Sequence, residues 1–321
     1  MRPVIFRSVF FIMFIYSDDN KRYLTQNYFL HHKFGKKVIK LSLNCNFTCP
    51  NRDGSKGTGG CIYCSASKSG DFGGCPSDSI PLQIEKQKKM MSSKWSDGLY
   101  IPYFRAGTNT YAPLDTLKNM YETALSAENT VGLAIATRAD CISDEMTEYF
   151  RELSGKTYLT IELGLQTIHD ETASKINRCH TYEDFLETYS KLQNAGINVC
   201  IHLINGLPGE TYDMMMESAK AVSALHPHSV KLHMLHIIKD SPLAEIYEKN
   251  PFELLTLEEY VKIICDQIEI MPEDVIIQRV TGDGNRDTLI APEWTLKKFV
   301  VMNEIDKEFV RRNSWQGKFY V

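Results

Sequence analysis

Three cysteines lie close together in a glycine-rich segment of this chain. Cys49 is followed by a stretch that holds four glycines, and Cys61 and Cys64 come directly after it. Cysteine thiolates are the usual ligands of iron–sulfur clusters. Three thiolates can hold three irons of a four-iron cluster and leave the fourth iron open to another ligand, which indicates a reactive cluster rather than an electron carrier. The segment is therefore a candidate cluster site.

A structural zinc site is the alternative. Adding Cys45 gives four cysteines separated by three, eleven and two residues, a set that could bind zinc. Spacing alone does not separate the two metals. Cys45, however, precedes the bulky Phe47 instead of closing a tight knuckle, and the glycine-rich loop offers backbone N–H groups that suit the sulfides of a cluster. These two features favour a cluster held by Cys49, Cys61 and Cys64, and the rest of the chain must decide between the two metals.

The cysteine segment directly follows an expected strand. Residues Lys37–Leu43 alternate between apolar and polar side chains, as a half-buried strand does. From there on, strand-like and helix-like stretches alternate, which predicts parallel β/α units. Ser143 and the capping box that begins at Thr256 mark two helix starts. The expected strands are Lys37–Leu43, Leu99–Phe104, Gly132–Thr137, Tyr158–Leu165, Asn198–Ile204, Ser229–Ile237 and Val275–Val280.

These units predict an α/β fold: a partial TIM-type (β/α)6 barrel with a small C-terminal helical extension. The carboxyl ends of barrel strands share one face, so the polar residues that follow the strands should form one site. We expect an apolar, dispensable N-terminal extension at residues 1–20, the barrel at 21–285 and a C-terminal extension at 286–321. The apolar run Val4–Tyr16 is too short to span a membrane. We therefore expect no membrane association.

The bulk composition excludes some classes of protein. The 321 residues include 36 Lys and Arg against 40 Asp and Glu, a net charge of −4, and 43% hydrophobic residues, which is typical of a folded globular protein. A globally basic nucleic-acid binder is excluded, so a polynucleotide substrate would need a local basic patch. The nine cysteines are unevenly spread and do not suggest a disulfide framework, which favours the reducing cytoplasm.

Polar or glycine-bearing motifs follow each expected strand. Taken together with the cysteine segment, they resemble those of the radical S-adenosylmethionine (SAM) superfamily, over about residues 21–300. Within it the chain is similar to a little-characterised bacterial family near the elongator catalytic subunit and oxygen-independent coproporphyrinogen oxidase. The motifs that carry the resemblance are Cys49-Pro50-Asn51-Arg52-Asp53-Gly54, Cys61-Ile62-Tyr63-Cys64, Thr108-Asn109-Thr110-Tyr111, Glu162-Leu163-Gly164-Leu165-Gln166, Asn177-Arg178 and Gly206-Leu207-Pro208-Gly209-Glu210.

The sequence departs from the pattern of this family at two positions. Cys45 stands where the family usually has a residue that is not a ligand. Cys179 stands where a glycine is usual, between Arg178 and His180.

The resemblance implies a [4Fe–4S] cluster and SAM as cofactors. A reductant such as flavodoxin or ferredoxin would supply one electron, and cleavage of SAM would release a 5′-deoxyadenosyl radical that abstracts a substrate hydrogen. By resemblance, Gln166 and Arg178 hold the ribose and the carboxylate of SAM, and Arg138 assists at the methionine end. The implied cofactor-binding residues are Asn109, Arg138, Glu162, Gln166, Arg178 and His202, and the implied metal ligands are Cys49, Cys61 and Cys64.

Several of these residues have a structural alternative. Arg138 and Arg178 could form buried ion pairs with Asp140 or Glu162 instead of binding a cofactor. His236 is more often a core or surface residue than a catalytic one.

The substrate is less closely defined than the cofactors. Resemblance to the elongator catalytic subunit, which acts on wobble uridine, implies tRNA, and we expect remodelling of a uridine side chain rather than the full elongator reaction. Local basic patches for RNA could come from the lysines Lys86, Lys88, Lys89, Lys94, Lys297 and Lys298. A small-molecule substrate is the alternative within the enzyme class, and a zinc-stabilised, non-enzymatic binding protein is the alternative outside it.

Overall fold

One curled, parallel sheet forms the centre of the protein. The computed structural model describes residue 16 and residues 21–65 and 73–321. Its main sheet has seven strands in the order β1-β2-β3-β4-β5-β6-β8, and every neighbouring pair runs parallel. The expected partial α/β barrel is therefore confirmed, and each of the seven expected strands has a counterpart in it. The strands are β1 (Val38–Leu43), β2 (Leu99–Phe104), β3 (Gly132–Thr137), β4 (Tyr158–Gln166), β5 (Asn198–Asn205), β6 (Ser229–Met234) and β8 (Ile276–Arg279).

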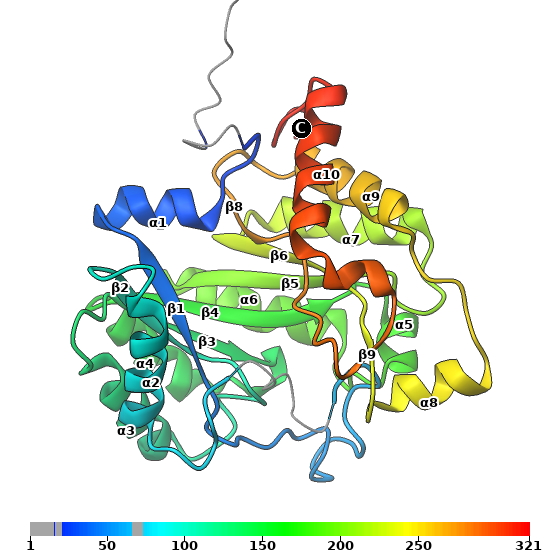
Figure 1. Ribbon diagram of the computed structural model, residues 1–321. Helices are drawn as coiled ribbons and strands as arrows, with labels where there is room; N and C mark the ends of the chain where they lie inside the picture. The colour runs from blue at the N-terminus through cyan, green and yellow to red at the C-terminus, as the bar shows by residue number, and fades with distance from the viewer. Residues whose placement is uncertain (1–15, 17–20, 66–72) are drawn as a thin grey trace, which may run out of the picture.

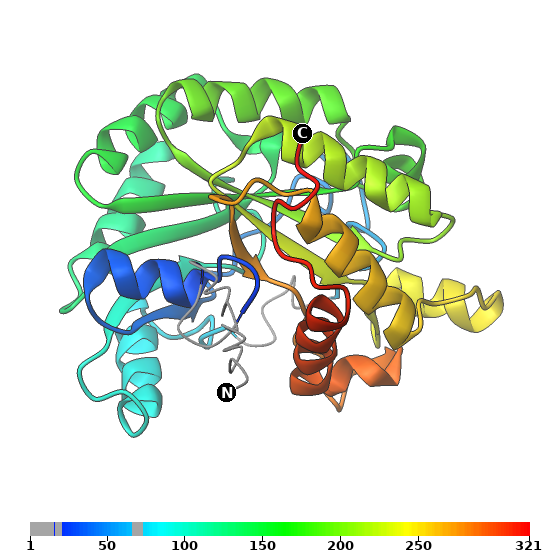
Figure 2. The same cartoon turned by 90° about the horizontal axis from the view of Figure 1, so that it is seen from above.

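Helices cover the outer face of the sheet. Figure 1 shows the strands in the middle of the molecule with helices outside them, and Figure 2 shows these helices as an arc around the curved sheet. The predicted caps are present, since Ser143 accepts a hydrogen bond from Met146 N and Thr256 forms a capping box with Glu259. The helices are α1 (Gln26–Phe34), α2 (Ile80–Ser92), α3 (Leu114–Leu125), α4 (Asp144–Ser154), α5 (Asp170–Lys175), α6 (Tyr182–Asn194), α7 (Tyr212–Leu225), α8 (Pro242–Lys249), α9 (Leu257–Glu269) and α10 (Lys298–Arg311), with short 3-10 turns η1 (Ala139–Cys141) and η2 (Glu293–Leu296).

The expected strand Ser229–Ile237 is divided in two. β6 ends at Met234, and Leu235 N still donates a ladder hydrogen bond to Asn205 O of β5 at 3.0 Å. The following residues form β7 (Ile237–Ile238), which pairs antiparallel with β9 (Leu289–Ala291) in a separate small sheet.

The barrel is open between its edge strands β1 and β8. The segment before α1 lies against the free edge of β8, where Ile277 N donates to Leu24 O at 2.8 Å. Leu24 N donates in turn to Gln316 Oε1 at 2.8 Å, and Arg22 Nη1 donates to the carbonyl of Phe309 at 3.2 Å. The beginning and the end of the described chain are thus joined at the open side of the barrel.

The C-terminal helix α10 packs into the same core as the barrel. Val301, Ile305 and Phe309 are fully buried and belong to the main hydrophobic cluster together with residues of the strands. The expected domain boundary at residue 285 stays a prediction. The expected extension at 1–20 falls outside the described residues, apart from Tyr16. Among the described helices, none combines the length and the apolar character that crossing a bilayer requires.

Candidate active site

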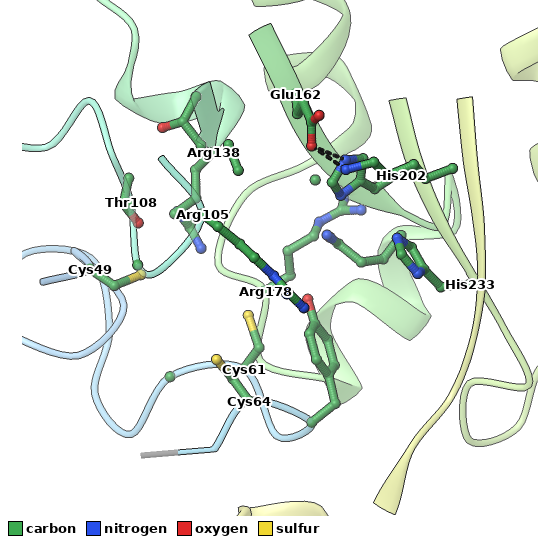
Figure 3. A pocket seen from close by; sticks show the side chains of 18 of the residues that line it. Cys49, Cys61, Cys64, Arg105, Thr108, Arg138, Glu162, Arg178, His202 and His233 are labelled. Carbon is green, nitrogen blue, oxygen red and sulfur yellow. Dashed lines mark hydrogen bonds and ion pairs between the residues drawn. The ribbon is translucent and has the colours of Figure 1, made fainter. Parts of the chain in front are cut away.

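A cavity of about 250 Å³ lies at the carboxyl ends of the strands. It is lined by the three cysteines of the glycine-rich loop on one side and by residues of six of the seven strands on the other. Figure 3 shows the labelled cysteines opposite Glu162, His202 and His233. The strand residues and strand-end residues that line it are Tyr103, Arg105, Ala136, Thr137, Arg138, Glu162, Gly164, Gln166, His202, Lys231, His233 and Arg279. The expectation that strand-end motifs form one site is met by this arrangement.

The cysteine loop is held in shape by two side chains. Arg52 donates to the carbonyls of Cys64 at 3.1 Å and Ser65 at 2.7 Å. Asn177 donates to the carbonyls of Thr58 at 3.0 Å and Gly60 at 2.8 Å. These contacts tie the loop both to itself and to the segment after α5. The motif residues Arg52 and Asn177 therefore fix the backbone that presents the cysteines.

The donor set suits a cluster better than a single zinc ion. Tetrahedral zinc brings its thiolate sulfurs to within about 4 Å of one another. Among the described residues, the loop cysteines do not form a group of three ligand atoms within 4.8 Å of one another. Cys45 does not line the cavity and packs against the hydrophobic core, where burial raises the pKa of its thiol to about 12. The zinc alternative with Cys45 as a fourth ligand is therefore not supported by this geometry.

Burial also affects the loop thiols. It raises the pKa of Cys61, and it raises the pKa of Cys64 to about 11. Both thiols are protonated at neutral pH in the metal-free protein. Binding of a metal centre must therefore release protons.

Glu162 is the centre of a buried ionic network. Its carboxylate is 0% exposed and accepts hydrogen bonds from Lys40 Nζ at 2.7 Å, Tyr103 OH at 2.6 Å and Lys231 Nζ. His202 Nε2 lies 3.0 Å from the same carboxylate. Burial alone would raise the pKa of Glu162, but Lys231 and Lys40 outweigh it and hold the pKa well below its usual range. Glu162 is therefore ionised.

His202 is neutral beside this carboxylate. Burial, and then the charge of Lys231, lowers the pKa of His202 to about 4. Because Glu162 is ionised, the proton of the neutral ring must lie on Nε2, where it is donated to the carboxylate. Nδ1 is then left as a hydrogen-bond acceptor. His202 therefore enters the site as an acceptor with a fixed tautomer.

Glu162, Cys200 and His202 also form the one group of potential metal ligands that the described residues bring within 4.8 Å. Both carboxylate oxygens of Glu162 already accept from ammonium groups, Lys40 on one oxygen and Lys231 on the other. A cation would have to displace both of these ammonium groups. We therefore interpret this group as an ionic network and not as a metal site.

Arg138 forms the structural ion pair that the sequence left open. Its Nε and Nη2 groups each lie 2.9 Å from a different oxygen of Asp140. Lys56 Nζ lies 2.9 Å from Asp140 Oδ2. Burial would raise the pKa of Asp140, but Arg138 and Lys56 together lower it to about 2. Arg138 still lines the cavity, and its Nη1 group is not part of this pair.

Arg178 is almost fully buried, at 1% exposure, and mainly binds backbone. Its guanidinium donates to the carbonyls of Leu165, Thr167 at 2.6 Å and His180 at 3.0 Å. Its remaining ionic contact is Asp170 Oδ1 at 3.5 Å, so it does not pair with Glu162. Arg178 thus fastens the end of β4 to the segment before α6.

Gln166 ends β4 in a strained conformation. Its φ is +63°, in the left-handed region that side chains other than glycine rarely adopt, and it follows an irregularity in the pairing of β4 with β5. In the orientation that satisfies its hydrogen bonds, its amide donates to the carbonyls of Gly164 at 3.2 Å and Leu165 at 3.0 Å. Its amide oxygen is then available to accept. Strain of this kind is characteristic of functional sites.

Asn109 lies beneath the cavity and does not line it. It is fully buried, and its Nδ2 donates to Ala136 O at 2.7 Å. The neighbours Gly107 and Thr108 line the cavity instead. Gly107 has a φ of +77°, and a side chain there would collide with the carbonyl of Phe47. Asn109 therefore supports a loop that glycine allows to approach the cysteine segment closely.

Two further polar residues, Asn205 and His236, lie outside this cavity. Asn205 exchanges hydrogen bonds with the Gln267 amide and is buried. His236 lines an adjoining hollow, and its Nε2 has no hydrogen-bond partner among the described residues. Neither lines the cavity that the cysteines share.

The candidate list from the sequence missed Lys40, Tyr103, Arg105, Lys231 and Arg279. A signal was present for some of them. Lys40 and Lys231 are charged residues inside strands that are otherwise largely apolar. A charged side chain that must be buried needs a buried partner, and Glu162 has the same anomaly in β4.

Comparisons with known proteins agree with this arrangement. The family described as "Radical SAM superfamily" matches residues 41–222, and the "Radical_SAM C-terminal domain" matches residues 227–311. The uncharacterised protein YtqA of Bacillus subtilis is 48% identical over 307 residues, which cover 96% of this chain and 95% of that protein. The resemblance inferred from the motifs is thus confirmed.

Two more distant similarities concern archaeal proteins. A tRNA uridine(34) acetyltransferase of Methanocaldococcus infernus is 28% identical over 173 residues, covering 53% of this chain and 32% of that protein. The solved structure of Methanocaldococcus infernus Elp3 has a TM-score of 0.61 at 21% identity, covering 72% of this chain and 59% of that chain. The structural similarity shows a shared fold.

Proposed function

The chain belongs to the radical SAM superfamily and is an enzyme, and from this premise we propose that it modifies the side chain of the wobble uridine in tRNA. The observation that carries the proposal is the shared cavity, in which three cysteines face a buried carboxylate network at the carboxyl ends of the strands. The tRNA substrate is supported by the similarity to a tRNA uridine(34) acetyltransferase.

The residues present fit a [4Fe–4S] cluster with SAM as its additional ligand. Cys49, Cys61 and Cys64 would hold the cluster, on the loop that Arg52 and Asn177 keep in shape. When bound, the cluster and SAM supply a 5′-deoxyadenosyl radical that removes a hydrogen atom from the substrate. The electron would come from a reductant such as flavodoxin or ferredoxin. We place the reaction in the cytoplasm, because a tRNA substrate and a reductant such as flavodoxin or ferredoxin would be available there.

The polar residues would orient SAM in the cavity. We assign the SAM carboxylate to the free Nη1 group of Arg138, because a guanidinium binds a carboxylate strongly. The amide oxygen of Gln166 and Nδ1 of His202 would accept from ribose hydroxyls. Arg178 and Asn109 act as positioning residues, since their donors bind backbone carbonyls around the cavity.

Glu162 would act through His202 and not on SAM directly. Its carboxylate is already surrounded by Lys40, Lys231 and Tyr103, and it accepts the Nε2 proton of His202. This fixes which nitrogen of His202 faces the cavity as an acceptor. The buried network would also keep water out of the site where a radical is handled.

The reaction class is tested by 5′-deoxyadenosine release. The protein is reconstituted with iron and sulfide without oxygen, then mixed with SAM and a strong reductant, beside Cys61→Ala. We expect release by the wild type and none by the variant. Zinc in place of iron, with no release, would overturn the cluster assignment.

The substrate is tested separately with the same reconstituted protein. Undermodified bulk tRNA is incubated with SAM and reductant, digested to nucleosides and examined by mass spectrometry. A mass change at uridine-34 derivatives that requires Cys61 is the expected result. If the wild type releases 5′-deoxyadenosine but changes no tRNA nucleoside, the tRNA assignment is wrong and the reaction class stands.

A further inference from the structure

A second cavity opens at the side of the barrel, between the edge strands β1 and β8. Its volume is about 460 Å³. Figure 2 shows α1 and α10 on either side of this open edge. The side cavity adjoins the cysteine cavity, because four residues line both: Tyr103, Arg105, Lys231 and Arg279. These shared side chains form the wall between the two cavities, and two of them, Tyr103 and Lys231, also bond to Glu162.

The side cavity is strongly basic. Seven cationic residues line it, against one lining carboxylate, Asp283. Two further carboxylates pair with these cations, Asp306 with Lys21 and Glu162 with Lys40 and Lys231. The three carboxylates pair with five of these cations, in a chain whose net charge is −4. The cationic residues are Lys21, Lys37, Lys40, Arg105, Lys231, Arg279 and Lys298.

Lys37 is the clearest candidate to bind an anion. It makes no ion pair with any described residue, and its ammonium donates to the side-chain oxygen of Asn27 and lies 5.2 Å from the ring of Trp95. Burial and the nearby charge of Lys94 lower the pKa of Lys37. An anion in the cavity would compensate this unbalanced charge. In a low-dielectric cleft such a charge attracts anions strongly.

Lys298 faces the same cavity from α10. It shares Asp283 with Arg279, and its Nζ lies 3.0 Å from Asp283 Oδ1. One carboxylate thus serves two cations, which leaves an excess of positive charge at this wall. The next residue on the helix, Phe299, is 78% exposed. Lysines beside exposed aromatic rings are the combination that binds single-stranded nucleic acid, through phosphate contacts and base stacking.

The other lysines that the sequence suggested are less suited to this task. Lys86 and Lys88 lie on α2, outside the barrel, and do not line either cavity. Lys86 pairs with Asp78 at 2.7 Å, and Lys88 donates to the carbonyl of Glu128. Of the suggested set, Lys298 is the one that lines the side cavity.

We propose that the side cavity binds phosphate groups of an RNA substrate. Lys37 and Lys298 hold the phosphates at the mouth, and Arg105 and Arg279 belong to the wall that the side cavity shares with the cysteine cavity. This inference rests on the proposed function, since it supplies the binding site for the RNA of that reaction.

The test is RNA binding by the reconstituted holoenzyme without reductant, so that no turnover is needed. A fluorescent anticodon stem-loop RNA is titrated at several salt concentrations with wild type, the double variant Lys37→Gln/Lys298→Gln and the matched control Lys249→Gln/Lys307→Gln. The control removes the same two charges from exposed lysines outside the cavity. Iron content and thermal midpoint are measured first on all three proteins.

We expect the cavity variant to bind RNA about tenfold or more weakly than wild type, with a log–log salt slope shallower by about 1.5, because each lost phosphate contact removes roughly 0.7 to 0.9. The control should retain both affinity and slope. Lys37→Arg/Lys298→Arg should restore binding, and Phe299→Ala should weaken it about tenfold through lost stacking. Equal losses in the cavity variant and the control, or wild-type binding by the cavity variant, would overturn the inference.

Competition distinguishes the source of the phosphate. Uridine 5′-monophosphate should displace the RNA weakly and only where Lys37 is intact, whereas uridine should not displace it. Binding of the mononucleotide with no RNA binding at all would overturn the assignment to RNA. Cavity-dependent RNA binding without any change in tRNA nucleosides would overturn the proposed function and leave the binding site standing.

Discussion

Lys40 and Glu162 form an ion pair across the inside of the barrel, with Lys40 Nζ 2.7 Å from Glu162 Oε1. They belong to β1 and β4, which are not neighbours in the sheet. The same ammonium lies 2.9 Å from Gln278 Oε1 on β8, the opposite edge of the sheet. Side chains therefore connect the two edge strands that have no backbone pairing with each other. The ionic network is both a wall of the active site and a brace of the open barrel.

Replacing Glu162 with Gln should destabilise the protein strongly. The change leaves the ammonium groups of Lys40 and Lys231 buried without their counter-ion, which costs about 3 to 5 kcal/mol when a buried pair is broken. Urea unfolding of the metal-free protein measures the loss. Lys40→Met should cost less, because Glu162 keeps Lys231 and Tyr103 as partners. Unchanged stability of Glu162→Gln would show that the charge of Glu162 contributes nothing to the stability of the fold.

The cysteines should separate into two classes by iron content. After anaerobic reconstitution we expect about four irons per chain in the wild type, and a loss of most of this iron in Cys49→Ala, Cys61→Ala and Cys64→Ala. Cys45→Ala should keep the full complement, because Cys45 packs against the core and does not line the cavity. Iron and acid-labile sulfide are measured together. Loss of iron in Cys45→Ala would give this residue the role of a ligand.

Cys179 should be replaceable by glycine with a gain in stability. Its φ is +61°, in the left-handed region that a side chain makes unfavourable. This explains why its family usually has glycine at this position. We expect Cys179→Gly to exceed Cys179→Ala by about 1 kcal/mol in unfolding free energy, since alanine keeps the strain. Both variants should retain iron, and iron loss in both would show that the Cys179 thiol serves the cluster.

Acid should weaken the contact between Asp283 and its two cations. Burial would raise the pKa of Asp283, but Arg279 and Lys298 lower it to about 2, compared with about 3.9 in an unfolded chain. A depressed pKa stabilises the fold above the unfolded value, and this stabilisation is lost as the pH falls from about 4 to 2. At pH 6 the free energy of unfolding of the wild type should exceed that of Asp283→Asn by on the order of 2 kcal/mol.

The comparison of thermal midpoints across pH tests this assignment. The gap between wild type and Asp283→Asn should shrink steadily below pH 4 and nearly vanish at pH 2. A gap that stays constant with pH would mean that the carboxylate charge of Asp283 contributes nothing. Glu245→Gln is a suitable control, because that exposed carboxylate lies 4.0 Å from Lys249 and should show no such gap.

The strands were predictable because the local sequence shows which of their residues are apolar and therefore buried. Leu99–Phe104 and Gly132–Thr137 match the observed strands residue for residue, since each is an apolar run bounded by glycine or polar residues. The strand expected at Ser229–Ile237 was too long, because Ile237 pairs with Ala291 in the small antiparallel sheet instead. That contact is distant in sequence, so no local pattern reveals it.

Site residues were predictable where they belong to a recognisable motif. The direction of a side chain was not predictable where it depends on packing. The three cysteines, Gln166 and His202 line the cavity as a strand-end rule implies. Asn109 was expected at the same place, but its side chain turns beneath the loop to bond Ala136 O. Which way a side chain turns depends on neighbours that only the folded chain brings together.

The joining of the two chain ends has a consequence for how the protein is made. Leu24 is synthesised long before its partners Ile277 and Gln316, and contacts of such long sequence separation form slowly. The segment before α1 therefore waits unpaired until β8 and the residues after α10 have been made. Closure of the open side of the barrel is thus a late step in folding.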